Sequence, residues 1–428
     1  MSRLHDIQDN IKQAAYLIGV QTPDVSDAEH KASLAELSRL VETLGFDVRG
    51  MSSQKRPGTG STHVLGDGKI EELTAELSGL NYLVVLDCEL SPNQIKNLEK
   101  SFDCEVMDRT AVIIEIFSRH ARTRAARLQV EIARLTYLAP RLRETGGGQD
   151  RQGGGIGGKG SGETSAELDK RRIRDRIKEL KSEFESIANE HDTRRARRTE
   201  VRSVALVGYT NAGKSSLMRA LTGSEVLVAD KLFATLDTTV RPLDPPSKPA
   251  ILISDTVGFI QKLPHDLVAS FKSTLDEAAG ASVLLYVVDG SDPSFRNQLD
   301  VTKTVLAEVG AQDIKSFLIL NKSDKMAPEL RAALATEFPD AIFNSTKSPA
   351  DVASLRERLI LEFENDMVDE EIFLPYSEDS IEGHRPKRMP IGEIHSLVKV
   401  LSEDYLADGI RLKVRATPET LRRLRARL

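Results

Sequence analysis

A short glycine-containing segment carries the residue types that bind phosphate groups. The apolar run Val201–Val207 leads into Gly208-Tyr-Thr-Asn-Ala-Gly-Lys-Ser215, and an apolar helix start follows. Glycines let backbone N–H groups curl around phosphate oxygens at the positive end of a helix. Lys214 is expected to reach the β- and γ-phosphates, and Ser215 to bind Mg²⁺. The predicted phosphate-binding set is Gly208, Tyr209, Thr210, Asn211, Ala212, Gly213, Lys214, Ser215 and Ser216.

A second element lies further along the chain, where the apolar run Ile251–Ser254 ends in Asp255-Thr256-Val257-Gly258. A carboxylate at Asp255 can lie beside Mg²⁺, and the Gly258 N–H can meet the γ-phosphate. A threonine between Ser215 and Asp255 is expected to complete the metal site. The candidates are Thr235, Thr238 and Thr239, and Thr239 is preferred. We expect catalysis to depend on Lys214, Thr239 and Gly258.

The strand-like run Ser316–Leu320 ends in Asn321-Lys-Ser-Asp324, a pattern suited to recognising guanine. Guanine offers two donors, N1–H and the 2-amino group, and one carboxylate at Asp324 can accept both. Adenine presents an acceptor in place of the first donor, so the same carboxylate rejects it. Lys322 is expected to lie along the base and Asn321 to brace the loop. A weaker element, Ser345-Thr346-Lys347, is expected to contact guanine O6 through its backbone.

A phenylalanine stands where rapid hydrolysis would require a polar side chain. GTPases of the Ras type carry a glutamine after the DxxG pattern, and this glutamine orients the attacking water. This chain has Phe259 there, which cannot hydrogen-bond water. Intrinsic hydrolysis is therefore expected to be slow, with a partner completing the site. His265 lies nearby, but a lone histidine is more often structural.

Composition describes a globular protein with two to four domains: of 428 residues, 40% are hydrophobic and 29% charged. The best apolar run, Ala281–Val288, is far shorter than the roughly 20 residues that span a bilayer. No secretory signal pattern begins the chain. Cys88 and Cys104 are too few for a zinc site or a disulfide framework. We expect a cytoplasmic protein without stable membrane insertion that acts as a monomer.

Charge is distributed unevenly along the chain. The net charge is −6, yet residues 119–202 contain 21 Lys and Arg against 13 Asp and Glu, a surplus of eight positive charges. Such a basic module favours docking on a polyanion. A well-solvated helical face explains the same composition equally well, so both interpretations stay open.

Hydrophobic periodicity divides the chain into four parts and predicts an α/β fold class. Residues 1–108 alternate strand-like and helical runs, as expected of a small α/β domain with a largely parallel sheet. Residues 109–199 change to a helical period, and their two apolar seams predict an antiparallel helical hairpin. Residues 200–364 predict a Ras-like P-loop domain. Residues 365–428 predict a small α+β domain whose first helix covers Ile391–Leu401.

A glycine-rich joint connects the two helices of the expected hairpin. Residues 146–162 hold ten glycines among 17 positions, which excludes a helix and predicts mobility. Within this joint, Gly153–Lys159 also matches the spacing of a phosphate loop. No strand precedes it, and Gly160 replaces the hydroxyl residue that Mg²⁺ needs, so we interpret the match as accidental.

Several stretches resemble the HflX family of translational GTPases. In the nucleotide-binding region the resemblance is carried by Phe233-Ala-Thr-Leu-Asp-Thr-Thr-Val-Arg241, Asp255-Thr-Val-Gly-Phe-Ile260 and Leu263-Pro-His-Asp-Leu-Val268. Elsewhere it is carried by Gly66-Asp-Gly-Lys-Ile-Glu-Glu72, Arg151-Gln-Gly-Gly-Gly-Ile-Gly157 and Asp169-Lys-Arg-Arg-Ile-Arg174. The chain departs from the family at Gly160-Ser-Gly-Glu-Thr-Ser165, where the family usually has Gly-Pro-Gly-Glu-Thr-Gln.

The resemblance implies a GTPase that uses Mg²⁺, binds the large ribosomal subunit and its ribosomal RNA, and splits ribosomes, notably under stress. It also implies that the glycine-rich tip points toward the peptidyl-transferase region. Asn211 matches the asparagine of potassium-stimulated GTPases, so a K⁺ requirement stays open. Two other functions stay open as well. One is a GTP-gated ribosome-assembly or RNA-remodelling factor; the other is a nucleotide kinase, which would have no use for Asn321–Asp324.

Overall fold

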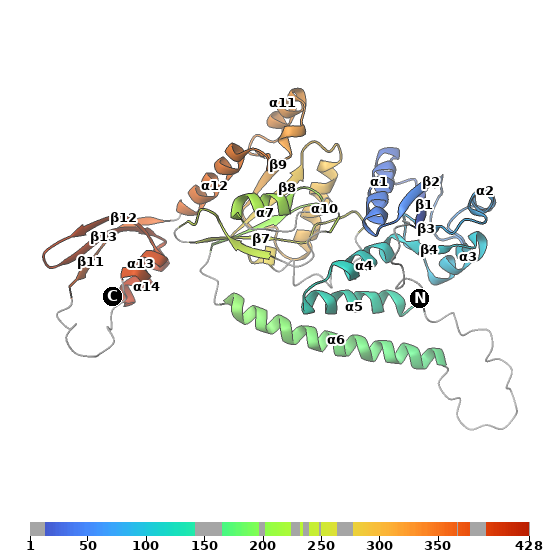
Figure 1. Ribbon diagram of the computed structural model, residues 1–428, viewed down its shortest axis with the longest axis horizontal. Coiled ribbons are helices and arrows are strands. Elements are labelled where there is room, and N and C mark those ends of the chain that lie inside the picture. Colours follow the sequence, from blue (N-terminus) through green and yellow to red (C-terminus); the bar gives the residue numbers. More distant parts are fainter. Residues whose placement is uncertain are drawn as a thin grey trace, which may run out of the picture. The chain divides into compact units, whose positions relative to one another are not determined.

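Two compact units make up the chain in the computed structural model. Figure 1 labels its helices and strands. The first unit comprises residues 1–193, 229–237 and 257–274, and the second comprises the remaining residues. The structure describes residues 13–141, 165–196, 202–223, 232–233, 239–247, 250–262, 277–365, 367–376 and 391–427. Within these ranges, every helix is too short or too polar to cross a membrane.

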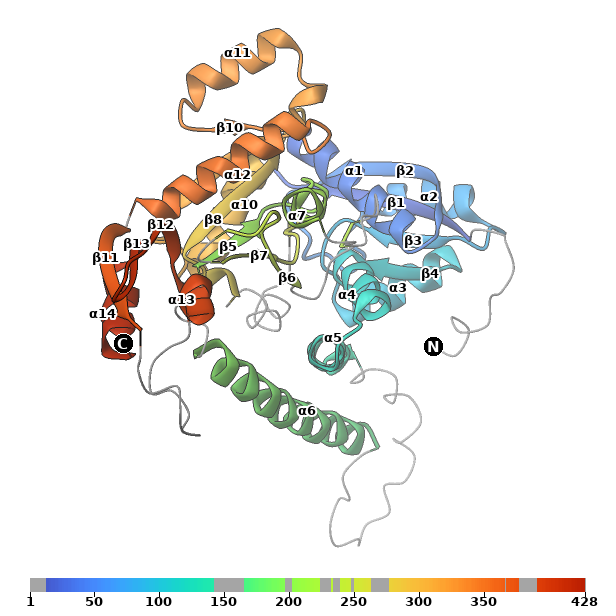
Figure 2. The same cartoon turned by 60° about the vertical axis from the view of Figure 1, so that its left-hand side comes forward.

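A parallel sheet forms the core of the first unit (Figure 2). Its strands lie in the order β2-β1-β3-β4, and all neighbours are parallel. The strands are β1 (Ala14–Gln21), β2 (Asp47–Lys55), β3 (Leu83–Leu86) and β4 (Glu105–Asp108). The connecting helices are α1 (Asp27–Thr43), α2 (Asp67–Leu77) and α3 (Pro92–Phe102). Helices α1 and α3 begin at capping boxes, because Ser26 and Ser91 each precede a Glu or Gln three residues later.

The carboxyl ends of β3 and β4 carry a buried polar cluster. Asp87 accepts hydrogen bonds from Ser33 Oγ at 2.6 Å and from Arg109 Nη1 at 2.7 Å. Arg109 is the first residue of α4 (Arg109–His120) and also pairs with Glu36 at 3.0 Å. Lys262 contributes a further cation to Asp87. Burial of these charges is tolerated because each one has an opposite charge in contact.

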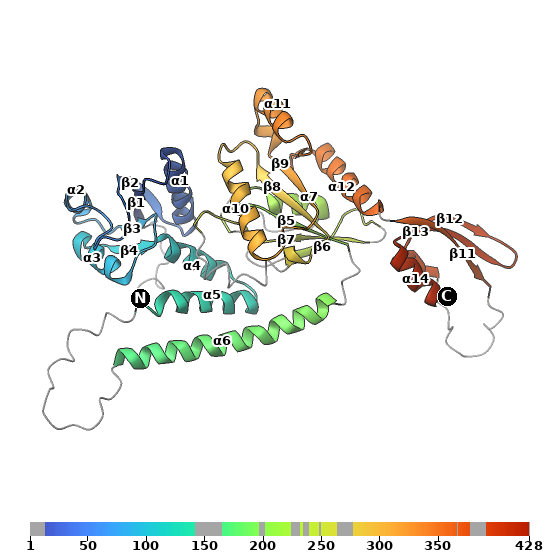
Figure 3. The ribbon, with the colours of Figure 1, turned by 180° about the vertical axis from the view of Figure 1, so that it is seen from behind.

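Helices α5 (Arg124–Leu138) and α6 (Ser165–Ala196) pack side by side, as the two apolar seams predicted (Figure 3). Leu128, Ile132 and Leu180 are buried between them. Arg124 of α5 pairs with Glu183 of α6 at 2.7 Å, which agrees with an antiparallel arrangement. The glycine-rich joint 146–162 lies outside the described residues.

A six-stranded sheet dominates the second unit, in the order β10-β9-β8-β5-β7-β6. All neighbours are parallel except β6, which runs antiparallel to β7. The strands are β5 (Arg202–Val207), β6 (Thr239–Pro242), β7 (Ile251–Asp255), β8 (Val283–Asp289), β9 (Ser316–Asn321) and β10 (Ile342–Phe343). The helices are α7 (Lys214–Thr222), α10 (Phe295–Glu308), α11 (Pro328–Glu337) and α12 (Pro349–Glu364). This is an α/β fold of the P-loop type, and its parallel strands end at one common edge, where such folds bind ligands.

A smaller antiparallel sheet follows, with strand order β11-β13-β12. Its elements are β11 (Val368–Pro375), α13 (Ile391–Leu397), β12 (Lys399–Tyr405), β13 (Gly409–Ala416) and α14 (Pro418–Arg427). The predicted helix Ile391–Leu401 is wrong in its last turn, because the helix ends at Leu397. Val400 pairs with Val414 of β13, so sheet pairing overrides the helical period there.

Candidate nucleotide-binding site

The phosphate loop lies between β5 and α7, at the edge where the parallel strands end. Gly208 and Gly213 have φ angles of 149° and 95°, which side chains rarely adopt. A Cβ on Gly208 would lie 2.2 Å from Val287 O, and one on Gly213 would lie 2.2 Å from Asn321 Nδ2. Among the described residues no side chain caps the start of α7, and a helix N-terminus of this kind suits an anion.

Lys214 occupies the first turn of α7 and is 6% exposed. Its ammonium donates to Gly208 O at 3.0 Å and to Tyr209 O at 2.8 Å, so it lies under the phosphate loop. Burial lowers the pKa of Lys214 to about 8, and the negative charge of Asp255 opposes that shift. A phosphate group beside this ammonium would raise the pKa of Lys214 again and stabilise the charged form, which suits an anion site.

Hard oxygen ligands meet next to Lys214. Ser215 Oγ donates to Asp255 Oδ2 at 2.7 Å, and Asp255 is fully buried at the end of β7. Thr239, the first residue of β6, pairs in register with Asp255 across the antiparallel strands. A buried carboxylate with two hydroxyl residues around it is a donor set that fits Mg²⁺. Thr256 differs, because its hydroxyl donates to Leu206 O at 2.7 Å and so braces β5.

The segment that follows Thr256 packs in the first unit. Val257, Phe259 and Ile260 are 7%, 3% and 1% exposed. Phe233, from the segment between Ser215 and Asp255, also packs in the first unit. Its ring centroid lies 4.5 Å from that of Phe117. Gly258 thus belongs to a different unit from the phosphate loop. Thr235, Thr238 and His265 lie outside the described residues.

The guanine-recognition pattern lies at the end of β9, beside the phosphate loop. Asn321 is 1% exposed and its amide donates to Ala212 O at 2.9 Å. Lys322 Nζ donates to Asn211 O at 2.8 Å. The two side chains therefore brace the phosphate loop from the end of β9, which is separated from β5 by β8 in the sheet. Asn211 itself has a φ angle of 60° and an exposed side chain.

Asp324 is oriented by the segment after β10. Ser345 Oγ donates to Asp324 Oδ1 at 2.8 Å, and Lys347 Nζ lies 3.2 Å from Asp324 Oδ2. The Ser345 hydrogen bond is the main cause that lowers the pKa of Asp324, with a smaller contribution from Lys347. Asp324 is therefore an ionised acceptor at neutral pH, as recognition of two guanine donors requires. Thr346 is half-buried beside it.

Two residues in this region were missed by the sequence patterns. Asn344 is fully buried, and its amide donates to Asn321 Oδ1 at 3.2 Å. Asp289 ends β8 and pairs in register with Asn321. The signal for Asp289 was present in the sequence, because it ends an apolar run just as Asp255 and Asn321 do.

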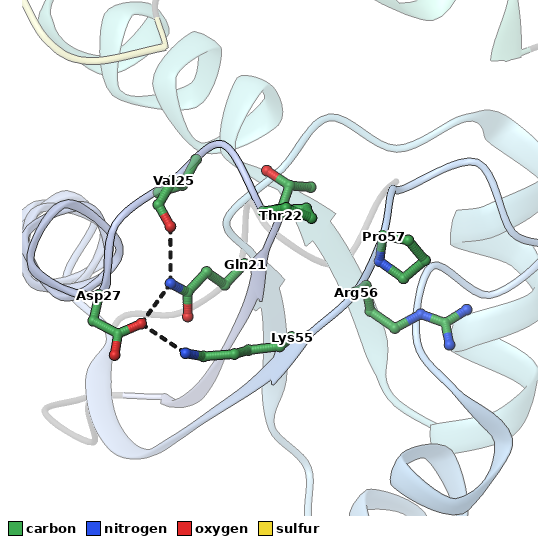
Figure 4. A pocket seen from close by; sticks show the side chains of 8 residues that line it. Gln21, Thr22, Val25, Asp27, Lys55, Arg56 and Pro57 are labelled. Carbon is green, nitrogen blue, oxygen red and sulfur yellow. Dashed lines mark hydrogen bonds and ion pairs between the residues drawn. The ribbon is translucent and has the colours of Figure 1, made fainter.

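A cavity of about 520 Å³ lies elsewhere, in the first unit at the carboxyl ends of β1 and β2 (Figure 4). Asp27 accepts from Gln21 at 2.7 Å and from Lys55 at 2.8 Å, and Gln21 also donates to Val25 O. These polar groups satisfy one another, so they give this cavity no evident ligand preference. The phosphate loop and its neighbours remain the better-supported site.

Comparisons with known families agree with this geometry. A family described as "GTP-binding GTPase N-terminal" matches residues 31–118, and "GTP-binding GTPase Middle Region" matches residues 120–198. A third family, "50S ribosome-binding GTPase", matches residues 203–322. The three matches follow one another along most of the described fold.

Whole proteins match over most of the chain. "GTPase HflX" of Gluconacetobacter diazotrophicus is 51% identical and covers 97% of both chains. "GTPase HflX" of Escherichia coli is 40% identical over 73% of this chain and 74% of its own. A GTP-binding protein from Sulfolobus solfataricus, solved with GDP, is 24% identical, with a TM-score of 0.44 over 82% of this chain and 99% of its own. The relatives aligned along the sequence show that the chain belongs to the HflX family of GTPases.

Proposed function

We propose that this GTPase docks on the large ribosomal subunit through its helical hairpin and couples GTP binding and hydrolysis to ribosome splitting. The observation that carries the proposal is the exposed basic surface of α6. Two comparisons support it: the "50S ribosome-binding GTPase" family matches residues 203–322, and "GTPase HflX" of Gluconacetobacter diazotrophicus covers 97% of this chain.

Exposed basic residues lie along residues 171–181 of α6, interspersed with the exposed acidic residues Asp175 and Glu179. Its apolar residues Ile177 and Leu180 pack against α5, while the basic residues are exposed. Some of these are paired within the helix, as Arg172 is with Asp169 and Arg176 with Glu179. The exposed basic residues are Arg171, Arg172, Arg174, Arg176, Lys178 and Lys181. Such a surface suits contact with RNA phosphates, which reward clustered positive charge.

The nucleotide site supplies the chemistry by positioning and charge. Lys214 would contact the β- and γ-phosphate oxygens, where its positive charge stabilises the charge that develops during cleavage. The N–H groups in the first turn of α7 would bind the remaining phosphate oxygens. Gly258 would offer its N–H to the γ-phosphate, as its DxxG position implies.

Ser215, Thr239 and Asp255 would hold Mg²⁺, which as a Lewis acid neutralises charge on the β- and γ-phosphate oxygens. Asp324 would accept both guanine donors, and Asn321 keeps the phosphate loop in place. The base and the phosphates would thus be bound by loops that contact one another through Asn321 and Lys322. Base recognition and phosphate positioning therefore depend on the same packing.

The buried Phe259 supports the expectation that a partner accelerates hydrolysis. Its ring is 3% exposed in the first unit and offers no group to orient water. Hydrolysis by the protein alone is therefore expected to be slow. A ribosomal surface that rearranges the segment after Gly258 would complete the site.

The test is the GTPase rate measured alone, with purified large subunits, and with purified small subunits. The proposal expects strong acceleration by large subunits and little by small ones. Splitting is followed in parallel by light scattering of intact ribosomes with GTP or a non-hydrolysable analogue. If large subunits bind and activate the protein but ribosomes stay intact, the function is instead assembly or RNA remodelling. Equal activation by both subunits would contradict the proposed partner.

A further inference from the structure

The ammonium of Lys322 has two partners, and one of them belongs to no nucleotide-binding pattern. Lys322 Nζ donates to Asn211 O at 2.8 Å and lies 2.8 Å from Asp289 Oδ2. The side chains of Lys322 and Asp289 are only 19% and 18% exposed. One lysine therefore joins the phosphate loop to the ends of β8 and β9.

Asp289 is itself held in a defined orientation. Its Oδ1 accepts from Ser291 N at 3.1 Å and from Ser291 Oγ at 2.6 Å, which leaves Oδ2 for Lys322. Gly290 N donates to Asn321 O at 3.1 Å, so the turn after β8 is bonded to the end of β9. A Cβ on Gly290 would lie 2.1 Å from Met326 Cε, so this turn packs closely against the loop after β9. The carboxylate is thus a preorganised receptor for the ammonium.

The backbone of Lys322 also depends on outside support. Its φ angle is 56°, a left-handed conformation that costs free energy for a residue with a side chain. Lys322 directly precedes the 3₁₀ turn η2 (Ser323–Lys325), which carries Asp324. The lysine side chain is flexible, so its aliphatic stem stays in contact with a purine only if the ammonium is held in one place.

We propose that Asp289 is a positioning residue for guanine-nucleotide binding and acts through Lys322. Its carboxylate holds the ammonium so that the lysine stem lies along the face of the base. Asp324 recognises the edge of the base, and the two roles are separable. Asp289 should therefore affect affinity for any purine nucleotide accepted by Asp324, without changing how the edge is recognised.

The experiment measures binding of GTP and ITP by the full-length Asp289→Asn variant. ITP lacks the 2-amino group, so the ratio of GTP affinity to ITP affinity measures how well Asp324 and its surroundings recognise that group. We expect affinity for both nucleotides to fall about tenfold, as loss of one charge-assisted contact gives. The GTP-to-ITP ratio should stay unchanged, and the loss should raise KM far more than it lowers kcat.

Four further variants make the result decisive. Asp289→Glu keeps the negative charge and should recover part of the affinity. Lys322→Ala should abolish the effect of Asp289→Asn, so that the double variant binds no worse than Lys322→Ala alone. Asp300→Asn, an exposed carboxylate on α10, is the matched control and should bind as the parent does.

Other outcomes overturn the proposal. A changed GTP-to-ITP ratio in Asp289→Asn would mean that the turn carrying Asp324 has shifted, which is a structural role. Additive losses in the double variant would mean that Asp289 does not act through Lys322. Unchanged affinity in Asp289→Asn, with normal thermal unfolding, would show that the ion pair has no part in nucleotide binding.

Discussion

Lys262 Nζ lies 2.8 Å from Asp87 Oδ2 and 3.1 Å from Asp87 O, and the two residues are 175 positions apart in the chain. The carboxylate is 1% exposed, whereas the lysine side chain is 44% exposed. Lys262 has a φ angle of 54° and lies two residues after Ile260, the end of the buried segment that contains Phe259. Asp87, at the end of β3, therefore fixes the end of that segment through its ion pair with Lys262. The same buried carboxylate also pairs with Arg109.

Removing the Asp87 carboxylate should destabilise the protein strongly. Asp87→Ala leaves Arg109 buried without this partner, and we expect a loss of about 3–5 kcal/mol in unfolding free energy. Lys262→Ala should cost about 1 kcal/mol or less, because the lysine is half exposed. Urea unfolding of both variants measures this. Asp47→Ala, which breaks the exposed pair with Arg49, is the control and should stay near the parent value.

Acid should weaken the same cluster. Burial raises the pKa of Asp87, but the charges of Arg109 and Lys262 more than offset it, so the pKa lies below the ordinary value of 3.8. A depressed folded-state pKa contributes stability above the unfolded value, and this stability is lost as pH falls through the folded value. Unfolding free energy should therefore fall below about pH 4, and less so in Asp87→Asn. If acid lowers the unfolding free energy equally in the parent and in Asp87→Asn, Asp87 is not the source of the acid sensitivity.

Nucleotide affinity should depend on pH through Lys214. The free protein releases the Lys214 proton near pH 8, and bound phosphate favours the charged form, so binding takes up a proton above that pH. Affinity should be constant below about pH 8 and fall up to tenfold per pH unit above it. Calorimetry of GDP binding in buffers of different ionisation enthalpy measures the proton uptake. The Lys214→Met variant should bind GDP weakly and take up no proton on binding. If proton uptake persists in this variant, another group is its source.

Base choice should depend on Asp324. Asp324→Asn replaces the double acceptor with a group that offers one acceptor and one donor, so GTP affinity should fall by orders of magnitude. Xanthine nucleotides present an acceptor that the new amide can donate to, so XTP should bind better than it does to the parent. Fluorescent GTP and XTP analogues give both affinities. Asp313→Asn, a change at an exposed residue near β9, is the control and should alter neither the GTP nor the XTP affinity. Unchanged GTP affinity in Asp324→Asn would show that Asp324 does not belong to the site.

Docking of the hairpin should be sensitive to salt. Exposed Arg171, Arg172 and Arg174 on α6 would release counterions from RNA phosphates, so affinity for large subunits should fall steeply as salt rises. Changing all three to Glu should weaken docking and flatten its salt slope while nucleotide binding is kept. Co-sedimentation over a salt series measures this. Arg422→Glu on α14 is a control with the same type of charge reversal and should dock as the parent does. Docking that is independent of salt and survives the triple change would favour the interpretation that α6 is only a well-solvated helix.

The local chemistry of the nucleotide site could be predicted from the sequence alone. The phosphate loop is eight consecutive residues, and its geometry follows from two glycines, a preceding strand and a following helix. The apolar seams of α5 and α6 likewise predicted their pairing, because a buried stripe at helical spacing needs a partner. The last turn predicted for α13 was wrong, because pairing with β13 competed with the helical period there.

Partners that are distant in the sequence were decided only by the tertiary structure. The strand order β9-β8-β5-β7 brings Asp289 to Lys322 and Asp255 to Ser215, although no fixed spacing relates these residues along the chain. The meeting of Asp87 with Lys262 depends on how the segment after Gly258 packs in the first unit. Sequence spacing specifies contacts within one loop or helix, where the backbone limits the distances. Contacts between strand ends depend on the order and packing of whole elements, which hydrophobic burial across the sheet determines.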